Sequence, residues 1–219
     1  MTDAAPPASE RTRVRRAAER AHYDTATLYS ILDDAYLCHL AFSDDRGTHC
    51  IPMACWREDA YLYIHGSNGS RLMKLAASGA QVCATVTHLD GLVLARSAFN
   101  HSMNYRSAVI YGAFEVVEGQ HKARAFDVFL ENIASGRSQE ARPGDSNELA
   151  ATTLLRIPLD EAVTKTRTGG PKDDADDMAR PVWAGVLPLA LVPLAPVPDG
   201  RQTEQPDYVR QWTRRGNVL

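Results

Sequence analysis

The feature that most constrains this chain is a series of short apolar runs separated by tight polar turns. Residues 36–43 read YLCHLAFS, and DDRG, THCIPMACW, REDA and YLYIHG follow in order. Runs of this length, broken by Asp, Arg and Gly, are typical of antiparallel strands joined by hairpin turns. Pro52 lies inside the second run and cannot donate to a strand ladder, so we expect that strand at a sheet edge or with a bulge.

Further strand and helix signals follow this meander. Residues 81–96, QVCATVTHLDGLVLAR, predict two strands around a turn near Leu89–Gly91, and residues 105–118 predict one long strand. Short helices are expected after a cap at Asp24 or Thr25, over residues 70–79 and 119–134, and around Glu148. At least six strands, short helices and many tight turns predict a mainly β fold, a small antiparallel β-barrel with helices at its openings.

Composition and charge exclude several classes of protein. The 219 residues carry a formal net charge of −3, so electrostatic attraction to nucleic acid or to an anionic membrane is not indicated. No apolar run reaches the roughly 20 residues that span a bilayer, and the N-terminus lacks the apolar core of a secretory signal, so we expect a cytoplasmic protein. The four cysteines lie in strand-like runs without C-x2-C spacing; we expect buried reduced thiols and no metal site.

The stretch IHGSNGSRLMKL, residues 64–75, has the features of an anion site between a strand and a helix. Ser70 stands where a helix N-cap is expected, and a helix start presents unpaired N–H groups and partial positive charge. Arg71 can make a bidentate bond to phosphate, and Lys74 projects from the same face as Ser70. An ordinary helix cap followed by solvated cations is the commoner explanation of such spacing, so spacing alone leaves both interpretations open.

Two further segments carry polar residues where strands begin or end. His65 ends a strand in which Tyr61 and Tyr63 share its face, and it is either a hydrogen-bonding or proton-relay group or a half-buried structural histidine. Residues 99–107, FNHSMNYRS, concentrate polar side chains at a strand mouth, which suits a ligand site but also suits the capping of loop backbone groups. The site candidates in this segment are Tyr105, Arg106 and Ser107.

Three stretches resemble the pyridoxamine 5'-phosphate oxidase-like superfamily of FMN-binding split barrels: YIHGSNGSRLMKL, LDGLVLARSAFNHSMNYRSAVIYG and PVWAGVLP. The nearest branch is the flavin-nucleotide-binding proteins related to nitroimidazole-resistance proteins, and the similarity runs in order over about residues 13–190. The resemblance implies an antiparallel split β-barrel that forms a homodimer, with FMN bound in clefts between the two subunits.

The resemblance also implies roles for single residues. Ser70 and Arg71 fall on the hydroxyl and base that grip the FMN phosphate, and Lys74 is the candidate second base because Leu72 stands at that place. His65 is the candidate catalytic residue, since a histidine there serves cofactor or substrate chemistry in nitroimidazole-resistance relatives. Ser107 falls on the flavin-contacting glutamine of the oxidases, and Trp183 is expected to be well buried. The other expected cofactor-binding residues are Pro52, Met53, Ala54, Gly66, Tyr105 and Arg106.

The function implied by the resemblance is that of an FMN-dependent oxidoreductase acting on a small molecule, with NADH or NADPH as the candidate donor. Vitamin B6 oxidation is not expected, because the oxidases continue past the tryptophan into a substrate-binding Arg-x-His segment, whereas PLALVPLAPVPDG stands here. That apolar segment suits a quinone or nitroaromatic better. A non-enzymatic flavin-binding protein and a haem-binding split barrel are the alternatives.

The expected organisation has three parts. Residues 1–20 are Ala/Pro/Arg-rich without a sustained apolar stripe and predict a flexible tail. Residues 21–190 form the expected FMN-binding split-barrel domain, and residues 191–219 form a C-terminal extension outside the resemblance. The expected partners are a second copy of the chain and a small-molecule substrate, with no nucleic acid and no membrane.

Overall fold

Every strand that the structure describes belongs to one antiparallel sheet. The computed structural model describes residues 5–201 and 204–213, in which ten strands are hydrogen-bonded in the order β1-β9-β6-β5-β2-β3-β4-β8-β7, with β10 added to β5. All pairings are antiparallel, so the predicted mainly β fold is confirmed. The strands are β1 (Ala21–His22), β2 (Leu37–Asp44), β3 (Gly47–Glu58), β4 (Tyr61–Ser67), β5 (Gln81–Leu94), β6 (Ser102–Ala113), β7 (Glu115–Val116), β8 (Thr152–Pro158), β9 (Ala162–Arg167) and β10 (Gly185–Pro188).

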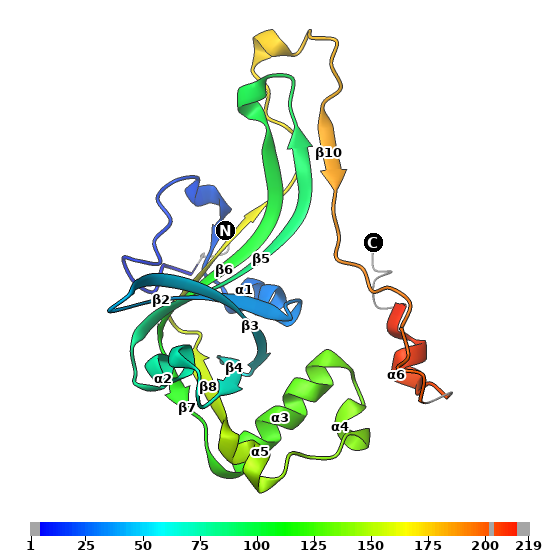
Figure 1. Ribbon diagram of the computed structural model, residues 1–219. Coiled ribbons are helices and arrows are strands. Elements are labelled where there is room, and N and C mark those ends of the chain that lie inside the picture. Colours follow the sequence, from blue (N-terminus) through cyan, green and yellow to red (C-terminus); the bar gives the residue numbers. More distant parts are fainter. Residues whose placement is uncertain (1–4, 202–203, 214–219) are drawn as a thin grey trace.

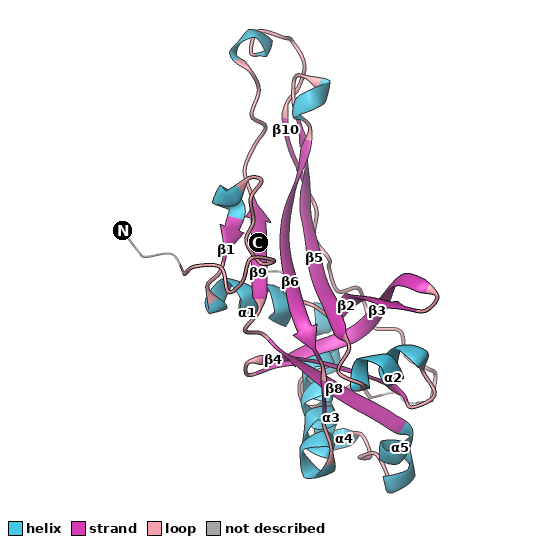
Figure 2. Cartoon of the chain, turned by 90° about the vertical axis from the view of Figure 1, so that its left-hand side faces the viewer, coloured by secondary structure: helices cyan, strands magenta, loops and turns pink. Residues whose placement is uncertain are grey.

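Short helices lie between the strands. They are α1 (Thr25–Asp33), α2 (Arg71–Ala77), α3 (Gly119–Ile133), α4 (Arg137–Glu140), α5 (Ser146–Ala151) and α6 (Asp207–Arg210), with 3-10 turns η1 (Ala18–Arg20), η2 (Ala98–Asn100) and η3 (Ala175–Asp177). α1 begins at the predicted cap, because the Asp24 carboxylate accepts from the amide of Thr27. Figures 1 and 2 show α3, α4 and α5 gathered at one end of the barrel. None of the described helices is long and apolar enough to cross a membrane.

The sheet curls because two strands that are adjacent in the sequence are far apart in the strand order of the sheet. β7 follows β6 after the single residue Phe114, although six steps through β5, β2, β3, β4 and β8 separate them in the sheet. Gly112 lies just before this junction with φ of +147°, a conformation that favours glycine, and a Cβ there would lie 3.5 Å from Ile157. The sheet must therefore return on itself, and it forms a barrel.

Two apolar clusters hold this barrel together. The larger fills its interior, and its largest fully buried side chains are Ile31, Leu32, Leu40, Leu62, Ile64, Met73, Ile110, Leu155 and Ile157. The smaller lies between the barrel wall and α3 and contains Trp56, Tyr63, Val117, Ala125 and Leu154. Cys38 and Cys55 belong to the larger cluster, but Cys50 is exposed on an edge strand. The predicted burial is therefore wrong for Cys50, which lies on the part of β3 that β4 does not pair, and Cys83 is only half-buried.

Residues 81–94 form one continuous strand and not the two strands that the sequence predicts. Leu89 and Gly91 face successive residues of β6, so Asp90 is an extra residue in the ladder. Such a bulge bends a strand without ending its pairing. The turn-like Asp-Gly pair therefore marks a bend in β5, and β5 and β6 continue beyond the barrel as an arm (Figure 1).

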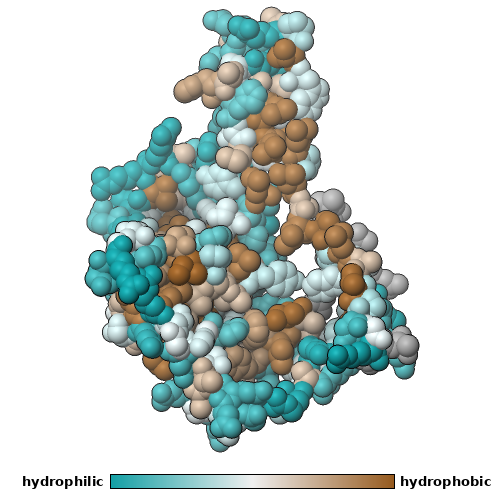
Figure 3. Space-filling model, viewed as in Figure 1, coloured by the Kyte–Doolittle hydropathy of each residue, from teal (hydrophilic) through white to brown (hydrophobic). Residues whose placement is uncertain are grey.

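The arm and the segment that follows it carry exposed apolar side chains. β10 pairs with β5 on the arm, and residues 189–201, here called the return segment, run back outside the barrel towards α6 (Figure 1). α6 is attached beside α4, because the Tyr208 hydroxyl donates to Glu140 at 2.6 Å and accepts from Arg137 at 3.0 Å. Figure 3 shows apolar surface along the arm and the return segment. Leu191, Leu194 and Val197 are 86%, 74% and 93% exposed.

The N-terminal residues contact the sheet. Arg11 donates to Glu161 at 2.7 Å and lies over the ring of Tyr111, and Thr12 is only 1% exposed. The sequence predicts a flexible tail over residues 1–20, whereas the structure packs part of this segment on the outside of β5, β6 and the turn before β9. The division of the chain at residues 20 and 190 stays a prediction.

The pair of Arg11 and Glu161 should stabilise the fold only above acidic pH. The Arg11 guanidinium lowers the pKa of the Glu161 carboxyl from 4.5 to about 2. A carboxylate whose pKa is lowered by folding stabilises the protein above its unfolded pKa, and this contribution is lost as the pH falls through the folded pKa. We expect Glu161→Gln to lower the free energy of unfolding at neutral pH, and its difference from the unchanged protein to shrink between pH 4.5 and about 2.

Denaturant unfolding followed over this pH range measures that difference. Asp160→Asn is the matched control, because Asp160 is the adjacent exposed acid. If the loss of unfolding free energy in Glu161→Gln were as large at pH 2 as at neutral pH, the ion pair with Arg11 would not be its cause.

Candidate functional site

The predicted site residues on β3, β4 and α2 lie where β3 and β4 separate, a place here called the opening. β3 is paired to β4 only from Cys55 onward, so its edge from Gly47 to Ala54 is free, and Pro52 lies on this edge as predicted. β4 continues past this point to the loop before α2. The Arg71 side chain then reaches back to Asp44, at the hairpin where β3 begins. The free edge of β3, the end of β4 and α2 therefore enclose a common region.

At one side of this opening, Ser70 and Arg71 have the donors that an anion needs. The Ser70 hydroxyl oxygen caps α2 by accepting from the amide of Met73 at 3.4 Å, so its own hydrogen is available to donate. Arg71 Nη1 donates to Asp44 Oδ2 at 2.7 Å, which uses one of its five N–H donors. The Arg71 side chain is 41% exposed, and Lys74 is exposed one turn further on. Both cations remain accessible to a ligand.

Asp44 is a residue of this region that the sequence analysis missed. Burial favours a raised pKa for this carboxyl, but hydrogen bonds from the Arg46 amide and His49 and the charge of Arg71 together hold its pKa below its usual value. His49 Nε2 lies 2.9 Å from the second carboxylate oxygen. Asp44 therefore stays ionised at neutral pH and fixes the direction of Arg71. Its position in an ordinary Asp-Asp-Arg-Gly turn gave no signal of this role.

The candidates on β3 and β6 share one face of the sheet. Ala54 lies opposite Leu37 of β2, and Ser107 lies opposite Thr87 of β5. The register between β2 and β5 pairs His39 with Thr85, and continued by two residues it sets Leu37 opposite Thr87. Directly opposed side chains of antiparallel strands point to the same side. Ala54 and Ser107 are therefore three strand spacings apart on one face, about 14 Å. Leu37 between them is 52% exposed, so this outer face is open in the single chain.

Strand alternation divides the remaining candidates between the two faces. Pro52 and Tyr105 lie on the outer face, two residues from Ala54 and Ser107, whereas Met53 and Arg106 point to the other side. Met53 packs against the barrel core. Arg106 donates to Asp90 at 3.1 Å and to Asp34 at 2.7 Å, and so connects the end of α1 to the bulge in β5. The cofactor roles of Met53 and Arg106 stay predictions. Because their side chains point away from the outer face, only their backbone atoms are available to a ligand on that face.

His65 lies in an apolar pocket beside α3. Its ring meets Phe129 and Phe126 edge-on, with centroids 4.8 Å and 5.5 Å away, and lies 5.8 Å from Trp56. His65 Nδ1 is buried without a hydrogen-bond partner, and burial lowers the pKa of this imidazole, so it is neutral at neutral pH. The pocket has a volume of about 300 Å³ and is lined by His65, Ala123, Phe126, Asp127, Phe129, Leu130, Arg142, Pro143, Gly144, Glu148, Leu149 and Thr152.

Gly66 lies near the end of β4 as predicted, and its cofactor role stays a prediction, whereas Trp183 lies elsewhere than expected. A Cβ on Gly66 would lie 2.8 Å from Cγ of Met73, so glycine here lets α2 approach β4 closely. Trp183 is 63% exposed, and its predicted burial is therefore wrong for the single chain. The reason is that Trp183 precedes β10 on the arm, where its ring lies against Gly185 and beyond the layers of the barrel.

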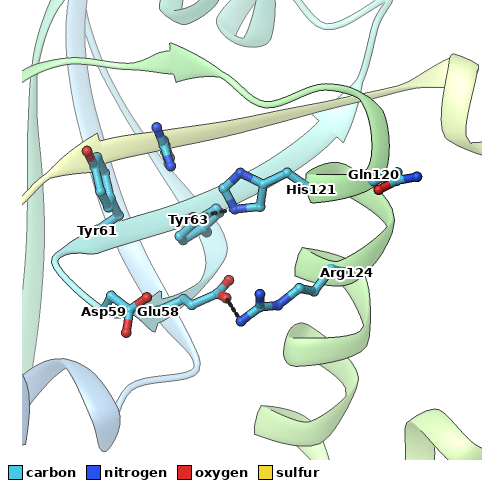
Figure 4. Close-up of a pocket in the computed structure, with 8 residues that line it drawn as sticks. Glu58, Asp59, Tyr61, Tyr63, Gln120, His121 and Arg124 are labelled. Carbon is cyan, nitrogen blue, oxygen red and sulfur yellow. Dashed lines mark hydrogen bonds and ion pairs between the residues drawn. The ribbon is translucent and has the colours of Figure 1, made fainter.

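A second, polar pocket lies on the other side of Tyr63. Its volume is about 410 Å³, and Figure 4 shows the side chains that line it between the β3–β4 turn and the first turns of α3. The Tyr63 hydroxyl lies 3.1 Å from His121 Nε2, and Glu58 pairs with Arg124 at 3.4 Å. The second carboxylate oxygen of Glu58 is buried without a partner. His121 was not a candidate, because it lies in a helix whose sequence predicts only a packing face.

The aromatic walls of the His65 pocket were also missed as site residues. The sequence predicts a helix over residues 119–134, and Phe126 and Phe129 are three residues apart in it, so their spacing was a usable signal of a shared face. Within the described ranges, no three His, Cys, Asp or Glu side chains gather closely enough to hold a metal ion.

Comparison with known proteins identifies the family. The sequence model of the pyridoxamine 5'-phosphate oxidase family matches residues 24–166, more than half of the chain. The chain belongs to this family. A flavocytochrome, Anf3 from Azotobacter vinelandii, is 36% identical to this pyridoxamine 5'-phosphate oxidase family member, with 94% of this chain and 98% of that chain covered and a TM-score of 0.89. The predicted split barrel is confirmed by this likeness.

Two other solved structures extend the comparison of this family member. A protein of Mycobacterium smegmatis described as FAD and heme binding is 35% identical, covers 89% of this chain and 97% of its own, and has a TM-score of 0.85. A putative 5-nitroimidazole antibiotic resistance protein from Bacteroides thetaiotaomicron is 21% identical over 66% of this chain and 85% of its own, with a TM-score of 0.56, and shares the fold. Among curated proteins no match is found.

Proposed function

We propose that this chain is a flavin-binding oxidoreductase that acts on a small molecule. The observation that carries the proposal is the opening between β3, β4 and α2, together with membership of the family. Arg71, held by Asp44, and the Ser70 hydroxyl supply donors for a phosphate group. Pro52 and Ala54 offer exposed apolar surface on the adjoining face, which suits a flat ring. A bound flavin would supply the electron transfer, and the residues of the chain bind and orient it.

The flavin is proposed to be FMN. Ser70 and Arg71 lie together at one point of the opening, and with Lys74 they suit a single terminal phosphate. The relative from Mycobacterium smegmatis carries FAD in its description, so FAD is the cofactor to distinguish. Release of the cofactor by denaturation, followed by chromatography against FMN and FAD standards, makes that distinction.

The substrate is proposed to be a quinone or nitroaromatic, with NADH or NADPH as electron donor. The outer face around Leu37 and the return segment around Leu191 are apolar, and a flat, weakly charged molecule fits such surfaces. A non-enzymatic flavin-binding protein is the competing function. It would bind the same cofactor but would not pass electrons from the nicotinamide.

The colour of the purified protein tests the proposal. We expect a yellow protein whose flavin bleaches when NADH or NADPH is added without oxygen, and whose colour returns when a quinone is added. Flavin that binds but never bleaches would favour the non-enzymatic binder. A colourless protein that takes up neither FMN nor FAD on titration would contradict the proposal.

Haem is a second cofactor that one part of the structure favours. Two relatives are described as a flavocytochrome and as an FAD and heme binding protein. In this chain His65 is neutral, has a buried nitrogen without a hydrogen-bond partner, and faces an apolar pocket walled by Phe126 and Phe129. A neutral imidazole against apolar surface suits a haem iron ligand. We therefore assign His65 to haem in this proposal, and the opening at β3 and α2 to the flavin.

The protein is proposed to be a homodimer. Leu37, Leu89 and Met103 are 52%, 44% and 52% exposed, and the return segment adds further apolar surface. Monomeric proteins rarely leave so much contiguous apolar surface uncovered. A second copy would cover the outer face, where Ala54 and Ser107 lie.

Light scattering during size-exclusion chromatography should give the mass of two chains. Leu37→Asp should shift the protein towards the mass of one chain, because a charge on the covered face remains unpaired. Phe99→Asp is the matched control, since Phe99 is 94% exposed at the tip of the arm. A protein that stays monomeric with flavin bound at full occupancy would rule out the dimer.

Pyridoxamine 5'-phosphate and pyridoxine 5'-phosphate should not be turned over at a useful rate, in spite of the family name. The segment after Trp183 contains the apolar return segment, and no charged side chain stands between Trp183 and Asp199 to pair with a substrate phosphate. Burial of a phosphate dianion without paired cations costs several kcal/mol. Steady-state assays in which kcat/KM approached about 10⁴ M⁻¹s⁻¹, the low end for ordinary enzymes, would contradict this expectation.

A further inference from the structure

A row of aromatic side chains connects the His65 pocket with the polar pocket of Figure 4. Trp56 is 0% exposed, and its ring lies 5.8 Å from that of His65 and 5.5 Å from that of Tyr63, with which it stacks at 19°. Tyr63 is 2% exposed, but its hydroxyl lines the polar pocket. Indole and phenol are the side chains that give up a single electron most readily. The row therefore joins two cavities through oxidisable groups.

The far end of the row has a proton acceptor in place. The Tyr63 hydroxyl lies 3.1 Å from His121 Nε2, and Figure 4 shows the two side chains facing each other. The Arg156 guanidinium lies beside the same hydroxyl, and this contact raises the pKa of Arg156. Arginine can only donate, so the phenolic hydrogen is free for His121, which accepts it in the tautomer whose Nε2 carries no hydrogen. His121 lines a pocket of about 410 Å³, from which a proton can pass to solvent.

The protonation state of Tyr63 makes this acceptor necessary for oxidation. Burial raises the pKa of Tyr63, so the side chain is a neutral phenol at physiological pH. A phenol that loses an electron becomes strongly acidic, and the loss is favourable only when a base takes the proton. His121 is such a base at hydrogen-bond distance.

We propose that Trp56, Tyr63 and His121 form a proton-coupled electron relay between the His65 pocket and the polar pocket. It depends on the proposed function only for its natural oxidant, a haem that His65 would hold and that a peroxide would oxidise; this haem would take one electron from Trp56. Tyr63 returns one electron to the indole while its phenolic proton moves to His121 Nε2. This leaves neutral Trp56, a neutral phenoxyl at Tyr63 and an imidazolium at His121. A phenol or thiol in the polar pocket then gives one electron to Tyr63 and its own proton to solvent, and His121 returns its proton to Tyr63. This leaves a neutral Tyr63, a neutral His121 and a neutral radical of the phenol or thiol.

Tyr61 lies beside the row but is a poor alternative end point. Its ring centroid is 6.5 Å from that of Tyr63, and the Arg156 guanidinium lies over its face, 4.1 Å from the centroid. A cation over an aromatic face stabilises the neutral ring and opposes its oxidation. Tyr61 is therefore the matched control for Tyr63, on the same strand and beside the same pocket.

The test uses the full-length chain and needs no cofactor. A reference protein with Trp183→Phe and Trp212→Phe keeps Trp56 as its single tryptophan. An ultraviolet laser flash ionises Trp56, nitrate captures the ejected electron, and transient absorption follows the indole and phenoxyl radicals. We expect the indole signal to decay as the phenoxyl signal grows. Tyr63→Phe should lose most of the phenoxyl signal and prolong the indole radical, whereas Tyr61→Phe should leave both unchanged.

The proton step gives a second, independent readout. His121→Leu should slow the growth of the phenoxyl signal, and heavy water should slow it in the reference protein but not in the His121→Leu variant. These measurements remain decisive if Tyr63→Phe fails to fold, because His121 lies at the edge of the pocket. An unchanged phenoxyl yield in Tyr63→Phe, or equal rates with and without His121, would overturn the relay. Failure of the proposed function would appear separately, as a purified protein that takes up no flavin and no haem.

Discussion

Arg71→Ala should weaken FMN binding by about 1.5–3 kcal/mol, the range for a hydrogen bond to a charged group. This corresponds to roughly a 10- to 150-fold rise in Kd. The reason is that Arg71 provides the charged donors at the start of α2, held towards the opening by its bond to Asp44 at 2.7 Å. Riboflavin has no phosphate, so its binding should change little. Fluorescence titration of both ligands against both proteins measures the difference.

Arg46→Ala is the matched control for the Arg71 variant. Arg46 is an exposed arginine in the same hairpin as Asp44, so its removal changes the net charge equally. It should leave the affinities for FMN and riboflavin nearly unchanged, because screened charge without contact contributes little. Equal losses for FMN and riboflavin in Arg71→Ala would show that Arg71 does not bind the phosphate.

His65→Ala should abolish the Soret band that haem gives when bound to the unchanged protein. The variant removes the imidazole whose buried Nδ1 lacks a partner, and it leaves no histidine, cysteine or methionine among the residues that line the pocket. Burial lowers the pKa of His65, so its lone pair is available over the whole neutral range, and haem binding should weaken only as the pH falls below the histidine pKa. Absorbance titration with haemin measures both effects.

His101→Ala is the control for this experiment, because His101 is exposed and its Nδ1 contacts only the carbonyl of Ser97. It should keep the Soret band of the unchanged protein. Flavin content should be the same in both variants, because the proposal places the flavin at the opening near Arg71. A Soret band of unchanged position and intensity in His65→Ala would remove His65 as the iron ligand.

Local patterns predicted most elements of this fold. The cap at Asp24, the helix start at Ser70 and the edge position of Pro52 all follow from the hydrogen-bonding capacity of single residues and their neighbours. Such preferences act between residues that are close in the sequence, and the structure has the cap, the helix start and the edge strand where these preferences predict them. The bulge at Asp90 escaped prediction because an Asp-Gly pair fits a turn and a bulge equally well, and the length of β6 opposite it decides between them.

The candidate site was predicted only where it depends on one segment. Ser70 and Arg71 lie together because they are adjacent in the chain, but Asp44, which orients Arg71, lies 27 residues away in another hairpin. Likewise Tyr63 and His121 meet across 58 residues. The exposure of Trp183 depends on the arm, whose length no single motif specifies. Contacts of this kind arise from the closure of the barrel, and a single sequence does not display them.

The closure of the barrel also sets the order in which the molecule can be completed. β1 pairs with β9 through Ala21 and Lys165, and Arg11 meets Glu161 across 150 residues. During synthesis these contacts are unavailable until β9 has left the ribosome, when more than three quarters of the chain has been made. Proteins dominated by such distant contacts fold slowly, because loop-closure entropy is lost before the contacts form. The N-terminal residues are therefore synthesised first but are among the last to pack against the rest of the fold.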